Sequence, residues 1–244
     1  LHYPLRRQRQ MCIRDRFIDY FKNFTDLEEY LRAVKKSVIG YSNPLDDPKD
    51  YFLNEDIHPQ DMNFDIRLVG ERFNNGIPHE YFKNLLRSVS SHNNEDNIPG
   101  RELRLMVYEK NTNKIVGFIR LQSPLINSKP RNEWLGKAPN LTIFNRHTVM
   151  GFAIVPSQPF GYNYLGGKLL ALICVSHYIR EKLNDIFEKD IALFETTSLY
   201  GSSSSSSQYD GLKPFMRFKG LTDSKFIPVL YLSLIHISEP TRPY

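Results

Sequence analysis

The chain has 244 residues, and its 32 Lys and Arg against 27 Asp and Glu give a formal net charge of +5. This length accommodates one domain with a sizeable core, or a domain with a small helical attachment. No apolar run approaches the length that a bilayer-spanning helix needs, which argues against a membrane-spanning protein. The basic balance, taken by itself, would favour nucleic acid or an anionic membrane as a partner.

Both ends of the chain look foreign to the protein. Residues 6–16 (RRQRQMCIRDR) match one reading frame of a transposase-type sequencing-library adaptor, and residues 232–242 (LSLIHISEPTR) match its opposite strand. We therefore expect residues 1–16 and 232–244 to be translated adaptor rather than native sequence. The alternative is a basic amphipathic start and a short apolar end. The two segments hold six of the 32 basic and two of the 27 acidic residues, so without them the net charge is only +1.

The cysteine and histidine content predicts an intracellular protein without a metal. Cys174 is the only cysteine between the two predicted adaptor segments, so no internal disulfide argues for secretion. A lone cysteine of this kind is expected to be a small buried apolar residue rather than a nucleophile. The histidines show no metal-ligand spacing with Asp, Glu or Cys, and we expect no zinc site and a cytoplasmic location.

Residues 17–100 are predicted to form a polar, helical N-terminal segment. Thr25 and Glu28 form a capping box, and Pro78 occupies a first-turn position ahead of an apolar helical pattern. Residues 42–61 are rich in Pro, Asn and Asp and predict a loop. The turn-rich residues 90–100 mark a boundary, after which the period changes from helical to alternating.

Residues 101–231 are predicted to form an α+β domain. Residues 103–121 read as a β-hairpin around the turn at 111–114, and residues 124–139 as irregular chain. Residues 148–155 are apolar on both faces, which is typical of a central strand. A helix over 165–183 and a strand over 191–197 follow. This order predicts ligands at the strand ends near the middle of the sheet.

The turn after the central strand is the most informative segment. A strand that enters a glycine-bearing turn and then a helix directs backbone N–H groups and the positive end of the helix dipole at one point, which suits a phosphate. Lys168 in the first helical turn would strengthen anion binding. The alternative is a tight turn that needs its glycines only for packing.

Residues 150–183, the strand at 192–197 and the segment at 215–221 resemble the second half of the GNAT acyltransferase fold. Short stretches at 134–136, 145–146, 155–156, 163–170 and 193–196 more narrowly resemble the Druantia DruA family of phage defence, and phage proteins of the Mom DNA-modification type are similar in fold. The resemblance implies a mixed, mostly antiparallel sheet flanked by helices. It also implies an acyl-CoA or a related acyl donor, whose pantetheine arm would meet the central strand and whose pyrophosphate would meet the turn. The implied donor-binding residues are Ile154, Val155, Gln158, Gly161, Tyr162, Asn163, Gly166, Gly167 and Lys168.

On this fold the acceptor would lie near Glu195 and the serine run at 202–207. Acyl transfer needs a base for the acceptor and an acid for the leaving thiolate. Glu195 or Asp210 is the candidate base, and Tyr200 or Tyr209 the candidate acid. The alternatives are a surface carboxylate and ordinary core or rim tyrosines.

DNA is the predicted partner. Asn145, Arg146 and His147 precede the central strand, and Arg and His contact phosphates or base edges in nucleic-acid complexes. Trp134 offers a stacking group. Ser202, Ser203 and Ser204 would belong to an ordered, hydroxyl-lined loop beside the acceptor, with a flexible linker as the alternative. An ordinary solvated basic loop is the alternative for residues 145–147.

Three functions are therefore open. The first is a phage- or defence-related acyltransferase-like protein that acts on or binds DNA. The second is a non-catalytic interaction protein on the same fold, and the third is a small-molecule N-acyltransferase. A donor groove between the strands near residues 153 and 194 would favour either transferase over the non-catalytic protein. Basic residues around the mouth of that groove would favour the DNA-directed protein over the small-molecule N-acyltransferase.

Overall fold

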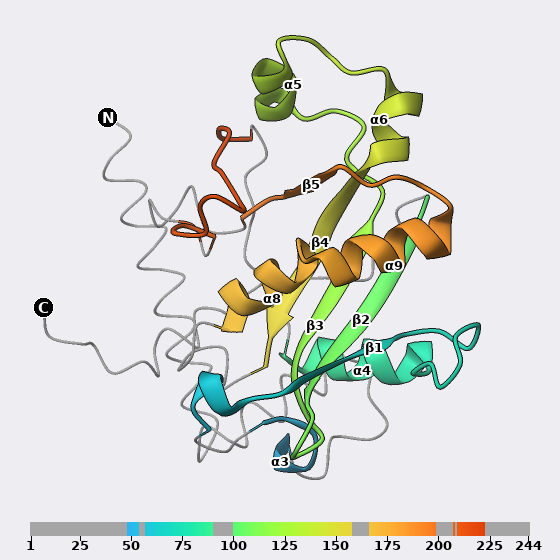
Figure 1. Cartoon of the computed structure of the whole chain (residues 1–244), viewed down its shortest axis with the longest axis vertical. Coiled ribbons are helices and arrows are strands. Elements are labelled where there is room, and N and C mark those ends of the chain that lie inside the picture. Colours follow the sequence, from blue (N-terminus) through green and yellow to red (C-terminus); the bar gives the residue numbers. More distant parts are fainter. Residues whose placement is uncertain are drawn as a thin grey trace, which may run out of the picture. The chain divides into compact units, whose positions relative to one another are not determined.

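A mixed five-stranded sheet in the order β1-β2-β3-β4-β5 organises the computed structural model (Figure 1). The structure describes residues 48–53, 57–89, 100–157, 166–198, 207 and 209–222, all within one compact unit, Asp47–Tyr244. The first four strands pair antiparallel, and β4 and β5 pair in parallel. This mixed sheet with flanking helices confirms the predicted α+β class. The strands are β1 (Phe64–Leu68), β2 (Glu102–Glu109), β3 (Lys114–Gln122), β4 (Thr148–Pro156) and β5 (Leu193–Thr196).

The β2–β3 hairpin forms where the alternating pattern predicted it. Leu103, Leu105 and Val107 are buried in the hydrophobic core. The turn is fixed by Glu109, whose carboxylate accepts hydrogen bonds from the Thr112 amide (2.7 Å) and hydroxyl (2.9 Å). Burial raises the pKa of Glu109, but these hydrogen bonds outweigh it and hold that pKa below its ordinary value.

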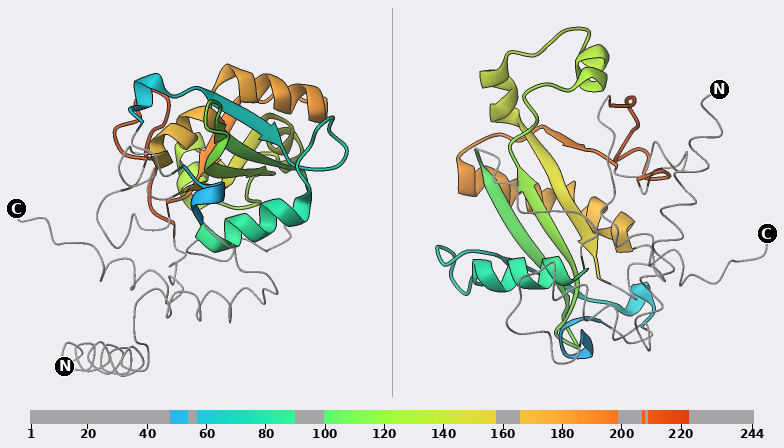
Figure 2. Two further views of the ribbon diagram at one scale, coloured as in Figure 1. Left: turned by 90° about the horizontal axis from the view of Figure 1, so that it is seen from below. Right: turned by 180° about the vertical axis from the view of Figure 1, so that it is seen from behind.

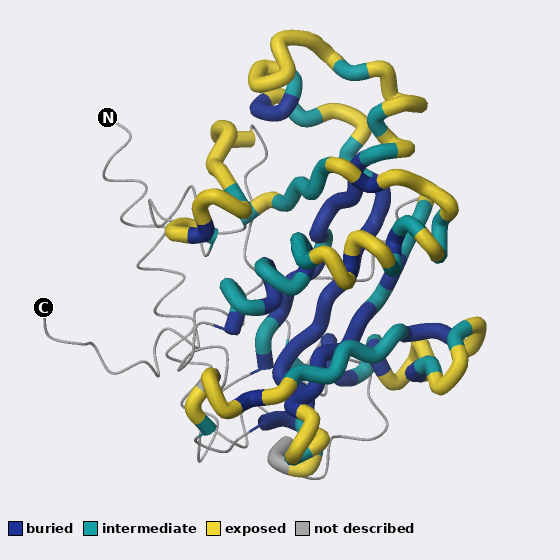
Figure 3. The backbone as a smooth tube through the Cα atoms, in the orientation of Figure 1, coloured by how far each residue is buried: buried dark blue, intermediate teal, exposed yellow. Residues whose placement is uncertain are grey.

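Helices cover both faces of the sheet. Figure 2 shows α8 (Gly166–Cys174) and α9 (His177–Phe187) on one face and α4 (His79–Val89) on the opposite face. α8 packs closely on β3, since a Cβ placed on Gly117 would lie only 2.4 Å from Leu170 Cδ1. β2, β3 and β4 form the buried centre, as the tube view shows (Figure 3). β4 is thus an interior strand, as its apolar sequence predicted.

Cys174 at the end of α8 is buried, and this burial raises the pKa of its thiol. The expectation of a small buried apolar residue is therefore confirmed.

One strand lies within the stretch that we predicted to be helical. Residues 64–68 form β1, which pairs with β2 from Phe64–Glu109 to Leu68–Leu105. Phe64, Ile66 and Leu68 pack against the core while Asp65 and Arg67 alternate with them. This alternation of apolar and polar residues is typical of a strand, and our prediction of a helical segment overlooked it. α4 does follow Pro78 as predicted, whereas Thr25 and Glu28 lie outside the described residues.

Four further segments differ from prediction. The helix predicted over 165–183 is two helices, because the Ser176 side chain caps a new start at α9 by accepting from the Ile179 amide. The irregular stretch at 124–139 contains α5 (Lys129–Leu135), with Pro130 in its first turn. Residues 145–147 end a helix, α6 (Leu141–His147), rather than forming a loop. Two short helices, α3 (Pro48–Tyr51) and a 3₁₀ turn (Pro59–Asp61), lie within the predicted loop at 42–61.

Within the part of the chain that the structure describes, no helix is both long and apolar enough to cross a membrane. The predicted adaptor segments, residues 1–16 and 232–244, lie outside the described residues.

A cationic groove at one end of the sheet

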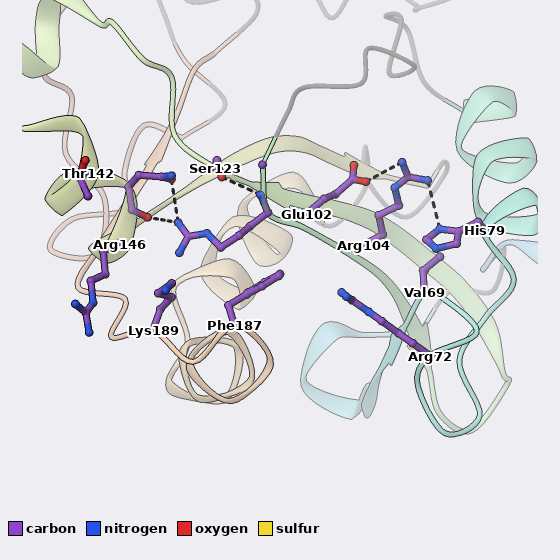
Figure 4. A pocket seen from close by; sticks show the side chains of 13 residues that line it. Val69, Arg72, His79, Glu102, Arg104, Ser123, Thr142, Arg146, Phe187 and Lys189 are labelled. Atoms are coloured by element: carbon purple, nitrogen blue, oxygen red, sulfur yellow. Dashed lines mark hydrogen bonds and ion pairs between the residues drawn. The ribbon is translucent and has the colours of Figure 1, made fainter.

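A cavity of about 860 Å³ opens at the end of the sheet where β2 and β4 begin and β3 ends (Figure 4). Four separate parts of the chain form its walls: the β1–α4 connection, the start of β2 with the end of β3, α6, and the end of α9. We call this cavity the cationic groove. Its lining consists of Val69, Arg72, His79, Gly100, Arg101, Glu102, Arg104, Ser123, Thr142, Asn145, Arg146, Phe187 and Lys189.

Positive charge dominates the cationic groove. Its walls carry four arginines and one lysine against a single carboxylate, that of Glu102. Glu102 is already paired, with Arg104 at 2.9 Å and with Arg120 on β3. Arg146 and Lys189 are exposed, and among the described residues neither forms an ion pair. Most of this positive charge is therefore available to an anionic ligand.

Arg101 is held rigidly in the wall of the cationic groove. Its Nη2 donates to the carbonyl of Asn145 and to that of Thr148 (2.9 Å), which joins β2 to the end of α6 and the start of β4. Burial lowers the pKa of Arg101, although a guanidinium remains charged at neutral pH. Among the described residues, its Nη1 is buried without a hydrogen-bond partner. A buried donor without a partner costs free energy.

Arg104 is the second fixed cation. Its Nη2 pairs with Glu102 and its Nη1 lies 3.5 Å from His79 Nδ1, while its Nε is buried with no hydrogen-bond partner in the described part of the chain. The same polar face of the sheet continues to Gln122 on β3, whose amide oxygen and nitrogen are both buried and find no hydrogen-bond partner among the residues that the structure describes. Such groups in a native structure need a specific explanation, and a ligand is one.

The predicted nucleic-acid residues divide into two groups. Asn145 and Arg146 line the cationic groove. His147 does not line it, since its Nδ1 contacts the carbonyl of Asp190 (2.7 Å) beside the start of β5. Trp134 lies on α5, half exposed, with Lys219 Nζ 3.9 Å from its ring centroid. Ser202, Ser203 and Ser204 lie outside the described residues.

The predicted acid and base residues have different surroundings. Glu195 on β5 pairs with Arg131 on α5, and burial raises its pKa despite the lowering effect of that cation. Asp210 accepts from the Ser207 amide (2.8 Å), and the Tyr209 amide donates to Ser207 Oγ (3.2 Å), so both belong to a closed turn. Tyr200 lies outside the described residues.

The described part of the predicted donor turn begins α8. Gly166 is buried, and Gly167 faces Pro156 at the end of β4. Lys168 Nζ lies 3.6 Å from the position that a Cβ on Gly211 would take, so the structure brings this lysine beside the turn of Asp210. Ile154 and Val155 are buried on β4, whereas Gln158, Gly161, Tyr162 and Asn163 lie outside the described residues. The start of α8 and the cationic groove lie at opposite ends of the nine-residue strand β4.

The family model described as Druantia protein DruA matches residues 16–206, more than half of the chain. The chain belongs to this family. Membership in the DruA family links the protein to phage defence, as the short stretches quoted from the sequence indicated. The match includes every residue that lines the cationic groove. No curated protein and no solved structure matches the chain.

Sequence reasoning missed most of the cationic groove of this DruA-family protein. Arg72, Arg101, Arg104 and Lys189 were not singled out. A signal existed in the hairpin, where Glu102, Arg104, Arg120 and Gln122 occupy one face opposite the apolar residues. Four polar residues on the same face of two paired strands indicate a polar site. Burial of a guanidinium such as that of Arg120 costs free energy unless it is paired, so a face that carries one is more than ordinary solvated surface. The described residues contain no group of three or more His, Cys, Asp or Glu that could hold a metal ion.

Proposed function

We propose that this phage-defence-related protein binds DNA and holds its phosphodiester backbone in the cationic groove. The observation that carries the proposal is that five cationic side chains line one cavity, against a single carboxylate that is already paired. Arginine and lysine supply most of the contacts that proteins make to nucleic-acid phosphates.

The distribution of the cations favours a chain of phosphates over one small anion. Figure 4 shows Arg146 on α6 and Lys189 toward one side of the lining, and Arg72 after β1 and Arg104 toward the other. A single phosphate would be reached by only some of these side chains. A backbone that runs along the groove would meet them in turn, as in sequence-independent nucleic-acid binding.

The cations would have two roles. Arg101 and Arg104 are fixed by carbonyl groups and by Glu102, so they would place a phosphate with little loss of side-chain entropy. Arg72, Arg146 and Lys189 are exposed and would add long-range attraction that salt screens. Thr142 and Asn145 add neutral hydrogen-bonding groups.

The salt dependence of binding tests this proposal. The affinity for a fluorescent 20-base-pair duplex is measured at several salt concentrations for the wild type and for Arg72→Gln/Arg146→Gln/Lys189→Gln. Each phosphate contact adds about 0.9 to the slope of log affinity against log salt. The triple variant should therefore bind more weakly and lose up to about 3 from that slope.

A matched control removes three charges elsewhere. Lys110→Gln/Lys114→Gln/Lys182→Gln takes the same charge from the hairpin end of the sheet and from α9. This control should keep most of the affinity. Equal loss in both triple variants would mean that net charge, and not the groove, binds DNA, and absence of duplex binding by the wild type would refute the proposal.

A second candidate is acyl transfer to an acceptor, with the donor at the start of α8. Three observations favour it. β5 pairs with β4 only along residues 148–151, so the rest of β4 has no strand partner on that side among the described residues. Lys168 also lies beside the Asp210–Gly211 turn, so the cation that would bind the acyl donor is next to Asp210, a candidate base. The raised pKa of Glu195 brings that carboxylate closer to the range useful for a general base.

Calorimetric titration with acetyl-coenzyme A separates this candidate from DNA binding alone. Lys168→Gln should weaken donor binding about tenfold, which corresponds to one charge-assisted hydrogen bond. Lys182→Gln on α9 is the control and should leave donor binding unchanged. A wild-type protein that shows no heat of binding would argue for the non-catalytic alternative.

A further inference from the structure

A second surface, away from the cationic groove, exposes aromatic rings among cations. Phe215 and Phe218 are 67% and 73% exposed, and Trp134 on α5 is 50% exposed. Arg217 and Lys219 alternate with the two phenylalanines along the chain, and Lys219 stacks on Trp134 at 3.9 Å. We call these five residues the aromatic face.

The segment that carries the two phenylalanines is anchored to the rest of the molecule. Leu212 is buried, and Met216 packs against the core with its amide donating to the Leu212 carbonyl (3.1 Å). Gly220 has φ +138°, and a Cβ there would lie 3.0 Å from Pro130 Cβ on α5. The exposure of Phe215 and Phe218 is thus a property of a positioned segment. Large exposed apolar groups that gather in one place mark binding surfaces.

The charges decide which partner fits. Cores of protein–protein interfaces are depleted in lysine, whereas here Lys219 lies over the Trp134 ring and Arg217 and Lys219 flank Phe218 along the chain. Surfaces for unpaired nucleotides combine cations, which meet the phosphates, with aromatic rings, on which bases stack. Bases in a duplex are already stacked on each other, so only unpaired bases can use the exposed rings.

We infer that the aromatic face binds single-stranded nucleic acid by stacking bases on Trp134, Phe215 and Phe218. This inference rests on the proposed function, because the cationic groove supplies the sequence-independent affinity to which stacking adds. The ligand would then be DNA that is single-stranded in part, with its backbone in the groove and its unpaired bases on the aromatic face.

An oligonucleotide without bases tests the inference. Affinities of the wild type are measured for a fluorescent 20-nucleotide oligo(dT) and for an abasic strand of the same length, which keeps the phosphates and removes the rings. Stacking contributes about 1–3 kcal/mol per base, so oligo(dT) should bind at least about tenfold more tightly. Phe215→Ala/Phe218→Ala should remove this difference and leave duplex binding unchanged.

Conservative variants separate stacking from general apolar contact. Phe218→Tyr keeps the ring and should keep the preference for oligo(dT), while Phe218→Leu keeps only the apolar volume and should reduce it. Tyr178→Ala on α9 removes another ring, 49% exposed and near the Lys182 ammonium, and should have no effect. The melting temperature of each variant is measured to confirm that it folds.

The outcomes distinguish the two proposals. Equal wild-type affinity for oligo(dT) and the abasic strand overturns the stacking inference while DNA binding in the groove stands. Equal effects of Phe218→Tyr and Phe218→Leu also overturn it. Absence of binding to every oligonucleotide overturns the proposed function itself.

Discussion

Arg131 on α5 forms an ion pair with Glu195 on β5, with Nη1 3.2 Å from Oε1, and the two side chains are only 5% and 19% exposed. The same guanidinium donates to the carbonyls of Leu125 (2.8 Å) and Ile126 (3.2 Å). It also stacks on the Phe144 ring of α6 at 4.4 Å. Arg131 therefore connects α5, α6 and β5 inside the structure.

Arg131→Leu should destabilise the fold by about 3 kcal/mol near neutral pH, because it leaves the Glu195 carboxylate shielded from water without a cation. Burial already raises the pKa of Glu195, and removal of the opposing Arg131 charge raises it further. A carboxyl with a raised folded-state pKa stabilises the fold below its unfolded pKa, and that stability is lost as pH rises through the folded pKa. The cost of Arg131→Leu should thus be smaller at pH 4 than at pH 7, as measured by urea unfolding.

The double variant Arg131→Leu/Glu195→Gln provides the control, because it has no carboxyl to titrate at position 195. Its stability relative to the wild type should vary much less with pH than that of Arg131→Leu. A cost of Arg131→Leu that is equal at both pH values would show that lost packing, and not an uncompensated charge, is responsible.

The cap of α6 should control one wall of the cationic groove. Asn140 Oδ1 accepts from the amides of Thr142 (3.1 Å) and Ile143 (3.2 Å), and this short helix carries Arg146 in its last turn. Asn140→Ala should cost about 1 kcal/mol of helix stability. The Phe144 amide, which bonds to the Asn140 carbonyl, should then exchange its hydrogen faster, and DNA affinity should fall. Asn140→Asp keeps the cap and should behave like the wild type. An unchanged rate of hydrogen exchange at the Phe144 amide in Asn140→Ala would contradict the capping role of Asn140.

Close packing of α8 on β3 should make Gly117 intolerant of a side chain. A new methyl group would meet Leu170 Cδ1 at 2.4 Å and the Val155 carbonyl oxygen at 3.0 Å. Gly117→Ala should destabilise by about 1–3 kcal/mol through overpacking. The effect should shrink in a Leu170→Ala background, where space is available, and a thermodynamic cycle of the four proteins measures this coupling. Strict additivity would place the clash elsewhere.

The predicted adaptor segments should contribute nothing to stability. Deletion of residues 1–16 and 232–244 should leave the melting temperature unchanged within error, because translated adaptor has no evolved contacts with a core. Deletion of the 13 C-terminal residues alone gives a separate comparison for each end. A large loss of stability on either deletion would identify that segment as part of the protein.

Local patterns in the sequence were sufficient for the elements that depend on neighbours along the chain. The β2–β3 hairpin follows from alternation around a polar turn, and α4 follows from Pro78 and an apolar helical face. β1 was missed because five residues with partial burial give a weak signal until β2 is placed beside them. The break between α8 and α9 depends on one serine side chain, which the apolar pattern of residues 165–183 does not reveal.

The candidate site was less accessible to prediction. Asn145 and Arg146 were recognised because they precede a strong strand, but Arg72 and Lys189 reach the same cavity only through the tertiary fold. The charge of Arg101 and Arg104 gave no hint that each would be partly buried and held in the wall of this cavity, because burial depends on how the surrounding segments pack. Spacing along the chain cannot reveal a site assembled from four separate segments.

The four-segment construction of the cationic groove has a thermodynamic consequence. A ligand that contacts Arg72, Arg101, Arg146 and Lys189 together would bind only the folded protein, because these residues separate on unfolding. Binding and folding are therefore linked. A ligand at one hundred times its dissociation constant adds about 2.7 kcal/mol to the free energy of unfolding. The melting temperature measured with increasing DNA would thus report occupancy of the groove without any label, and the thermal stability of this protein would depend on how much nucleic acid accompanies it.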